Sequence, residues 1–250
     1  MVVANSVIET RAKAFSQGAD RYAQVRPGYP DAAVDWLLEG LPPKSRILDL
    51  AAGTGKLTKS LVARGFSVIA VDISEPMLAQ LSAQLPNVET VIGTAEDIPL
   101  PTSSVAAVVC GQAWHWFDQD AAAAEIARVL RPGGILGVIW NIKDNATDWV
   151  AQYDAILHKD DPLPVARANP RFGPEFEPVV FHRFYWADDI PISSLRTLAA
   201  SRSYLLTLPD TQREALLQQV DELAAGHPDL AGNEIVALPY HTDAYRSRRR

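Results

Sequence analysis

Short apolar runs alternate with longer, helix-like stretches through the first 140 residues of the chain. The runs end at Leu50, Asp72, Ile92, Cys110 and Trp140. A run that is apolar at nearly every position is typical of a strand buried on both faces. Strands that alternate with helices at this spacing predict right-handed β-α-β units and therefore a mostly parallel sheet in an α/β fold.

The pattern also predicts the individual elements and their ends. Pro239 predicts that the last strand ends or lies at an edge of the sheet, and Asp31 is the predicted cap of the first helix. A turn at residues 132–134 should lead into the fifth strand. The predicted strands are residues 46–50, 66–72, 88–92, 105–110, 135–140, 176–186 and 234–238, and the predicted helices are residues 32–39, 56–64, 77–84, 120–130, 148–158, 193–204 and 211–225.

A glycine turn follows the first strand. Gly53 and Gly55 permit positive φ or a close backbone approach, and a helix starts directly after them. A strand, a Gly-x-Gly turn and a helix in succession predict a nucleotide-type binding site in a doubly wound sheet. The third glycine of a dinucleotide-binding turn would fall at Thr58, which argues against NAD or FAD.

Two acids indicate which nucleotide this turn would bind. Asp49, at the end of the first strand, would repel a pyrophosphate but attract an ammonium group. Asp72 ends the second strand, 19 residues after Gly53, the separation at which an acid reaches ribose hydroxyls. The site therefore requires a ribose and a cationic amino-acid end, and S-adenosylmethionine has both.

Further motifs follow in order along the chain. They are Val71-Asp72-Ile73-Ser74, then Gly93-Thr94-Ala95-Glu96-Asp97-Ile98-Pro99, and Arg128-Val129-Leu130-Arg131-Pro132-Gly133-Gly134. With the glycine turn, they resemble the class I S-adenosylmethionine-dependent methyltransferases. The phrases at residues 22–30 and 112–118 are similar to the type 11 branch, which includes trans-aconitate methyltransferase-like proteins. The resemblance covers about residues 15–145. It implies a Rossmann-like, doubly wound, seven-stranded and mostly parallel sheet whose last strand is antiparallel.

The resemblance also implies a set of cofactor contacts. Asp49 would hold the amino group, Asp72 the two ribose hydroxyls, and Ile73 would pack on adenine. Many members have an acid where this chain has Thr94, so Glu96 or backbone groups must recognise the adenine amine. Tyr22 and Arg26 would approach the methionine carboxylate, and Met77 could equally be a core residue. The full set of implied contacts is Tyr22, Arg26, Asp49, Ala51, Gly53, Gly55, Asp72, Ile73, Met77, Ala95, Glu96 and Gln112.

His115 is the candidate catalytic residue, in the phrase Trp114-His115-Trp116-Phe117. Its ordinary pKa of about 6.5 suits a general base, or it could donate a hydrogen bond to the acceptor. Alternatively it only orients the loop, while the two tryptophans fill space beside the cofactor. Because the cofactor brings the reactivity, methyl transfer needs neither a metal nor a covalent nucleophile, and we expect no metal site.

Composition restricts the partners. The net charge of −7 argues against a general nucleic-acid binder, and no window approaches the ~20 apolar residues of a membrane helix. The basic residues 246–250 are expected to be a frayed terminus. The lone Cys110 is expected to be a buried hydrophobe. No signal peptide is recognisable, so we expect a cytoplasmic protein, monomeric or homodimeric.

The chain contains no internal repeat or linker, so one domain over residues 1–250 is expected. Residues 1–30 would form a lid, or alternatively a surface arm packed on the domain. Residues 31–140 would form the cofactor-binding core, and residues 141–250 the acceptor-side cover with the last strands. The function predicted is in-line methyl transfer from S-adenosylmethionine to a small-molecule acceptor. A carboxylic acid would fit the resemblance, and phenols, amines and lipophilic acceptors are equally open. The alternatives are a non-catalytic cofactor-binding regulatory protein of the same fold, a dinucleotide oxidoreductase, and an RNA or protein methyltransferase.

Overall fold

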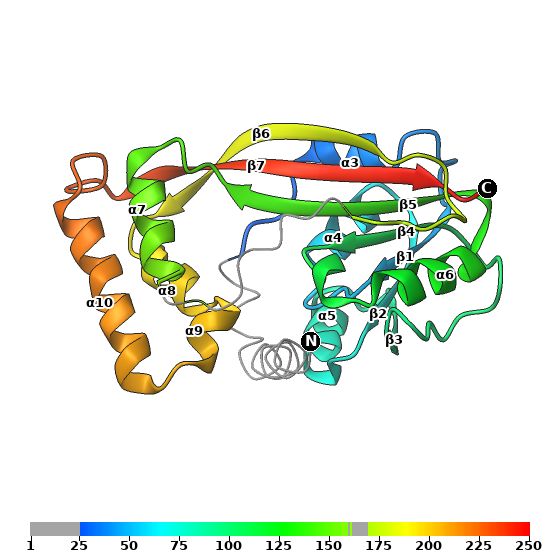
Figure 1. Cartoon of the computed structure of the whole chain (residues 1–250), viewed down its shortest axis with the longest axis horizontal. Helices are drawn as coiled ribbons and strands as arrows, with labels where there is room; N and C mark the ends of the chain where they lie inside the picture. Colours follow the sequence, from blue (N-terminus) through cyan, green and yellow to red (C-terminus); the bar gives the residue numbers. More distant parts are fainter. Residues whose placement is uncertain (1–25, 160, 162–169) are drawn as a thin grey trace. The chain divides into compact units, whose positions relative to one another are not determined.

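The computed structural model describes residues 26–159, 161 and 170–250 of the chain (Figure 1). Its strands are β1 (Arg46–Leu50), β2 (Ser67–Asp72), β3 (Glu89–Ile92), β4 (Val105–Gly111), β5 (Leu130–Lys143), β6 (Val180–Pro191) and β7 (Ile235–Arg248). Its helices are α3 (Asp31–Leu37), α4 (Lys56–Ala63), α5 (Glu75–Gln84), the 3₁₀ turn η1 (Trp114–Trp116), α6 (Gln119–Val129), α7 (Asp148–Leu157), α8 (Ser194–Ala200), α9 (Ser203–Thr207) and α10 (Asp210–Gly226).

The seven strands form one sheet in the order β3-β2-β1-β4-β5-β7-β6. The pairs β1–β2, β1–β4, β2–β3 and β4–β5 are parallel. Strand β7 runs against β5: Gly133 N–H donates to the Arg249 oxygen at 3.0 Å, and at the other end Asp144 N–H donates to the Pro239 oxygen at 2.9 Å. Figure 1 shows the β5 and β7 arrows pointing in opposite directions. The predicted α/β fold with an antiparallel last strand is confirmed.

The described chain divides into two compact units. Residues 28–141, 170–184 and 242–250 belong to one, which we call the sheet unit. Residues 26–27, 142–159, 161 and 185–241 belong to the other, which we call the helical unit because it contains α7 to α10. The predicted extent of a single domain with a lid and a cover stays a prediction.

Alternate residues of the central strands of the sheet unit enter two hydrophobic cores. Leu48 and Val108 pack in the core that includes Ile126 of α6, whereas Ile47 and Val109 pack in the core that includes α3 and α4. All five of these side chains are fully buried. Because successive side chains of a strand point to opposite faces, helices on both sides explain why these strands are apolar throughout.

The C-terminal residues are ordered within the sheet, so the prediction of a frayed tail is wrong. The guanidinium of Arg246 lies 4.3 Å from the centre of the Trp36 ring and pairs with Glu39 at 2.8 Å. Strand β7 continues through Pro239 and lies between β5 and β6, so Pro239 marks neither an edge nor an end. Gly133 and Gly134 form backbone hydrogen bonds with Arg249 of this tail, and β5 begins at Leu130 rather than at residue 135.

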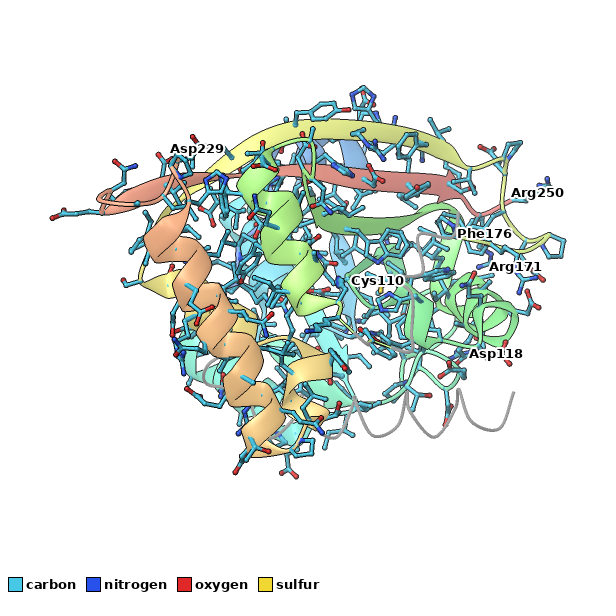
Figure 2. All side chains as sticks on the ribbon, turned by 60° about the vertical axis from the view of Figure 1, so that its left-hand side comes forward. Cys110, Asp118, Arg171, Phe176, Asp229 and Arg250 are labelled. Carbon is cyan, nitrogen blue, oxygen red and sulfur yellow. The ribbon has the colours of Figure 1, made fainter. Side chains whose placement is uncertain are left out.

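Several element ends also differ from the predictions. Helix α3 begins at Asp31 with Pro30 as its N-cap, so Asp31 is not the cap. The predicted helix 193–204 is two short helices, α8 and α9, and β6 covers residues 180–191 rather than 176–186. Cys110, labelled in Figure 2, is fully buried in the sheet unit, and burial raises the pKa of its thiol. The prediction of a buried hydrophobe is confirmed.

Candidate functional site

The two predicted acids lie at the same end of neighbouring strands. In the parallel β1–β2 pair, Asp49 is opposite Ala70 and Leu50 is opposite Val71, so Asp72 directly follows this pairing. The Asp72 carboxylate is near enough to raise the pKa of Asp49. The carboxyl ends of the strands are where doubly wound sheets bind ligands.

Asp72 holds together the turns that follow β1 and β2. Its Oδ2 accepts from the Gly53 N–H at 2.8 Å, and its Oδ1 accepts from the Ser74 N–H at 2.8 Å. Burial raises the pKa of Asp72, and these backbone N–H groups oppose the rise. Because each carboxylate oxygen has two lone pairs, both oxygens can still accept a hydroxyl group.

Asp49 is a buried carboxylate with one oxygen unpaired. The side chain is 1% exposed, and Oδ2 accepts from Thr58 Oγ1 at 2.6 Å. Oδ1 has no hydrogen-bond donor among the described residues. Burial, with a smaller contribution from Asp72, raises the pKa of Asp49 to about 7. An unpaired buried carboxylate oxygen is costly, and an ammonium group of a ligand would supply the missing donor.

The backbone around these acids adopts unusual conformations. Ala51 (φ +56°) and Gln112 (φ +62°) follow β1 and β4, and both are left-handed without being glycine. Such residues cost about 1–3 kcal/mol each and concentrate at functional sites. Gly53 (φ +55°) and Gly55 (φ +86°) complete the turn. The strands therefore end in backbone conformations of the kind found at functional sites.

The predicted adenine contacts differ in exposure. Ile73 is 60% exposed directly after Asp72, whereas Met77 of α5 is 7% exposed. The Met77 sulfur lies 3.5 Å from where a Cβ on Gly53 would be, so Met77 packs against the glycine turn. The exposed side chain of Ile73, directly after Asp72, is therefore available to stack on a base.

The loop after β3 begins beside Asp72, whose backbone oxygen accepts from the Gly93 N–H at 3.1 Å. Ala95 is buried in the core, and Glu96 is exposed. Glu96 Oε1 accepts from the Asp118 N–H at 3.0 Å, which joins this loop to the start of α6. One oxygen of Glu96 therefore already has a backbone partner.

His115 lies half-buried in η1 and is held by a tryptophan. The Trp140 Nε1–H donates to His115 Nδ1 at 3.5 Å, and the Trp116 ring centre lies 4.6 Å from that of His115. Burial lowers the pKa of His115 to about 4, so the ring is neutral at pH 7. Since indole nitrogen only donates, Nδ1 accepts and the ring proton sits on Nε2. His115 can thus donate a hydrogen bond, but its basic lone pair is engaged.

The other predicted cofactor contacts are Tyr22, Arg26 and Gln112. Tyr22 lies outside the described residues. Arg26 belongs to the helical unit, where its Nε donates to Ser201 Oγ at 3.0 Å. Gln112 is in the sheet unit, and its side-chain amide donates to the Asn141 oxygen at 3.1 Å. Its predicted contact with the cofactor stays a prediction.

Sequence reasoning missed Thr58 and Trp140 as members of the site. The glycine motif marks Thr58 only as the position where a third glycine is missing, yet its hydroxyl donates to Asp49. Its place in the first turn of α4 is the signal that could have pointed to this role. Trp140 gave no local signal because its partner His115 is 25 residues away.

The described residues contain no group of three or more His, Cys, Asp or Glu residues arranged to hold a metal. No helix within residues 26–159, 161 and 170–250 is long and apolar enough to span a bilayer.

Comparisons with known proteins bear on this geometry. A model of the family described as "methyltransferase domain" matches residues 48–138. An uncharacterized methyltransferase of Mycobacterium tuberculosis is 44% identical over 234 residues, covering 93% of this chain and 94% of the relative. The chain belongs to the class I S-adenosylmethionine-dependent methyltransferase family.

Two other relatives agree with this membership. An uncharacterized methyltransferase of Schizosaccharomyces pombe is 35% identical over 246 residues, which cover 95% of this class I methyltransferase and 97% of the relative. The solved structure of a proposed type II methyltransferase from Anaeromyxobacter dehalogenans superposes with a TM-score of 0.65 at 28% identity, covering 90% of this chain and 97% of that chain. The similarity therefore extends beyond the region that the family model matches.

Proposed function

We propose that this class I methyltransferase binds S-adenosylmethionine at the carboxyl ends of β1 and β2 and methylates a small-molecule acceptor by in-line displacement. The observation that carries the proposal is the buried Asp49, whose Oδ1 has no donor among the described residues. The ammonium of the cofactor would give that oxygen a charge-assisted hydrogen bond. A pyrophosphate in the same position would be repelled.

The other groups at these strand ends suit the rest of the cofactor. Asp72 would accept from the ribose hydroxyls with lone pairs that the Gly53 and Ser74 N–H groups leave available. Ile73, which is 60% exposed, would lie against the adenine. Glu96 or the backbone beside Ala95 would contact the adenine edge.

When bound, S-adenosylmethionine supplies a methyl group activated by its sulfonium, so the chain itself has only to position and protect the reactants. His115 would contribute a hydrogen bond from Nε2 to the acceptor, because Trp140 donates to Nδ1. A pKa of about 4 makes it a weak base and a neutral donor at pH 7. We therefore favour a hydrogen-bonding role for His115 over that of a general base.

The proposals for the acceptor class, the cellular location and the oligomeric state rest on the sequence. The charge of −7 supports a small molecule rather than a nucleic acid as acceptor. We also propose that the protein works in the cytoplasm as a monomer or homodimer. Carboxylic acids, suggested by the similarity to the trans-aconitate methyltransferase-like branch, come first among acceptors to test.

Calorimetry with S-adenosylhomocysteine tests the cofactor site directly. The wild-type protein should bind with a dissociation constant in the micromolar range. Asp72→Asn and Asp49→Asn should each weaken binding by about 10–100-fold, since each removes a charged partner from the ligand. Asp97→Asn, an exposed acid of the same unit, is the matched control and should bind as the wild type does.

Two results would count against this function. If the wild type does not bind, or if the Asp49 and Asp72 variants bind normally, the site is wrong. A screen of carboxylic acids, phenols and amines for release of S-adenosylhomocysteine then separates the enzyme from a regulatory protein that binds the cofactor without turnover.

A further inference from the structure

Three consecutive residues of β5 contact the loop that follows β4. The backbone oxygen of Ile139 accepts from the Gln112 N–H at 2.9 Å, and the backbone oxygen of Asn141 accepts from the Gln112 side-chain amide at 3.1 Å. Between them, the Trp140 Nε1–H donates to His115 Nδ1 at 3.5 Å. All five residues belong to the sheet unit. The loop that carries His115 is therefore bonded to β5 at two positions.

Gln112 is a strained residue of this loop. Its φ of +62° is left-handed, although it carries a side chain. Such a conformation is unfavourable outside glycine and persists only where the surrounding contacts impose it. Both bonds to Gln112 named above come from β5, so the left-handed conformation depends on where that strand lies at Asn141.

The side chain of Asn141 connects this part of β5 to two other segments. Its Nδ2 donates to the Gly28 oxygen at 2.7 Å, and its Oδ1 accepts from Thr242 Oγ1 at 2.7 Å. Gly28 precedes α3, and Thr242 lies on β7, the neighbour of β5 in the sheet. Because a carbonyl oxygen only accepts, the NH2 group of the amide has to face Gly28. Asn141 thus joins segments that are 113 and 101 positions away from it.

The bond to Gly28 also positions the next residue. A Cβ on Gly111 would collide with the Tyr29 hydroxyl and would contact Leu57 of α4 at 3.5 Å. Gly111 ends β4, directly before Gln112. Tyr29 therefore lies against the end of β4, beside the first turn of α4.

These contacts lie where a ligand is expected. The strand order β3-β2-β1-β4-β5 changes direction between β1 and β4, and doubly wound sheets bind ligands outside the carboxyl ends of the strands at such a point. Gly111 is at that end of β4, as Asp49 is at that end of β1. Backbone that is already in its ligand-binding conformation does not have to be ordered on binding, which strengthens the binding.

We propose that Asn141 is a positioning residue of the cofactor site, a role that rests on the function proposed above. Its side-chain bonds to Gly28 and Thr242 fix the place of its backbone oxygen, which holds Gln112 in the left-handed conformation. Through Gly28 it also keeps Tyr29 against the end of β4. Asn141 itself touches no reacting atom in this role and acts through the backbone after β4.

Asn141→Leu removes both side-chain bonds, keeps the approximate size of the residue and adds no charge. In calorimetry with S-adenosylhomocysteine, this variant should bind about tenfold more weakly than the wild type, because the backbone after β4 must then be ordered on binding. Asn233→Leu is the matched control: the Asn233 Nδ2 donates to the Asp229 oxygen at 3.2 Å, on the exposed surface of the helical unit. It should bind as the wild type does.

Melting curves confirm that these variants fold. Asn141→Ser is a second variant, because it is polar but lacks the amide group that reaches Gly28, and it should weaken binding likewise.

Gln112→Gly tests the physical reason. Glycine adopts a positive φ without strain, so a chain with Gln112→Gly no longer depends on Asn141 for this conformation. Adding Asn141→Leu to Gln112→Gly should therefore weaken S-adenosylhomocysteine binding by less than about threefold. An equal loss in both backgrounds would mean that Asn141 acts in another way, and the proposal would be overturned.

NMR of the ligand-free protein tests the same role without a ligand. The one-bond coupling between Cα and Hα of Gln112 depends on φ, and it should report a left-handed residue in the wild type and in Asn233→Leu but not in Asn141→Leu. The proposal would also be overturned if this coupling were the same in all three proteins, or if Asn141→Leu bound S-adenosylhomocysteine as tightly as Asn233→Leu.

These outcomes separate the role of Asn141 from the proposed function. If the wild type binds S-adenosylhomocysteine and Asn141→Leu binds it equally well, Asn141 has no positioning role while the proposed function stands. If the wild type does not bind it, but Gln112 loses its left-handed conformation in Asn141→Leu, the proposed function fails while Asn141 still positions the loop.

Discussion

Replacing Asp49 by asparagine should stabilise the ligand-free protein while it weakens cofactor binding. Asp49 is 1% exposed, and burial raises its pKa from 3.8 to about 7. A carboxyl with a raised pKa in the folded state makes folding less favourable as pH rises from the unfolded pKa to the folded one. The penalty is complete above pH 7, and the neutral amide of the variant cannot incur it.

The expected magnitude follows from the two pKa values. At 1.36 kcal/mol for each pKa unit, the folded protein loses about 4 kcal/mol at pH 8 and about 2 kcal/mol at pH 5. The amide of the variant can still accept from Thr58, so little else should change. We therefore expect Asp49→Asn to be more stable than the wild type, by more at pH 8 than at pH 5.

Urea unfolding at the two pH values, without cofactor, measures the effect. Asp189→Asn, an exposed acid on β6, controls for the change in net charge and should shift neither midpoint appreciably. The reasoning would be refuted if Asp49→Asn were no more stable than the wild type at pH 8, or if its advantage were equal at both pH values. A stabilised variant that also binds S-adenosylhomocysteine weakly would show that the Asp49 carboxylate lowers folding stability but strengthens ligand binding.

Three further predictions concern the surroundings of the site. Gly111→Ala puts a Cβ 2.4 Å from Tyr29 Oη and should cost about 1–3 kcal/mol of unfolding free energy, part of which Tyr29→Phe restores; an unchanged melting temperature would contradict the contact. Since the pKa of His115 is about 4, nitrogen NMR between pH 6 and 8 should detect one neutral tautomer with its proton on Nε2, and Trp140→Phe should increase the population of the Nδ1–H tautomer; a titration midpoint above pH 6 would disprove the lowered pKa. Gly55→Ala, at φ +86° and with its Cβ 2.8 Å from a leucine of α5, should cost about 1–3 kcal/mol and weaken S-adenosylhomocysteine binding; normal values of both would refute the role of the turn.

Local pattern was enough to predict the parallel core of the sheet. Strands β1, β2 and β4 are apolar because helices cover both faces of the sheet there. The glycine turn and the acids at residues 49 and 72 are features of single strand ends, and parallel pairing brings such ends together. For this reason the candidate cofactor site could be predicted before the fold was known.

What the sequence could not reveal depends on partners far apart in the chain. The basic tail is ordered because Gly133 and Gly134 pair with Arg249, more than 110 positions away, a contact that no local pattern encodes. The neutral state of His115 depends on burial and its tautomer on Trp140, and the lowered pKa of Lys143 depends on burial first and then on Arg202. Residue types and strand ends are thus determined locally, whereas burial and long-range contacts, which set protonation and charge balance, are decided only by the tertiary structure.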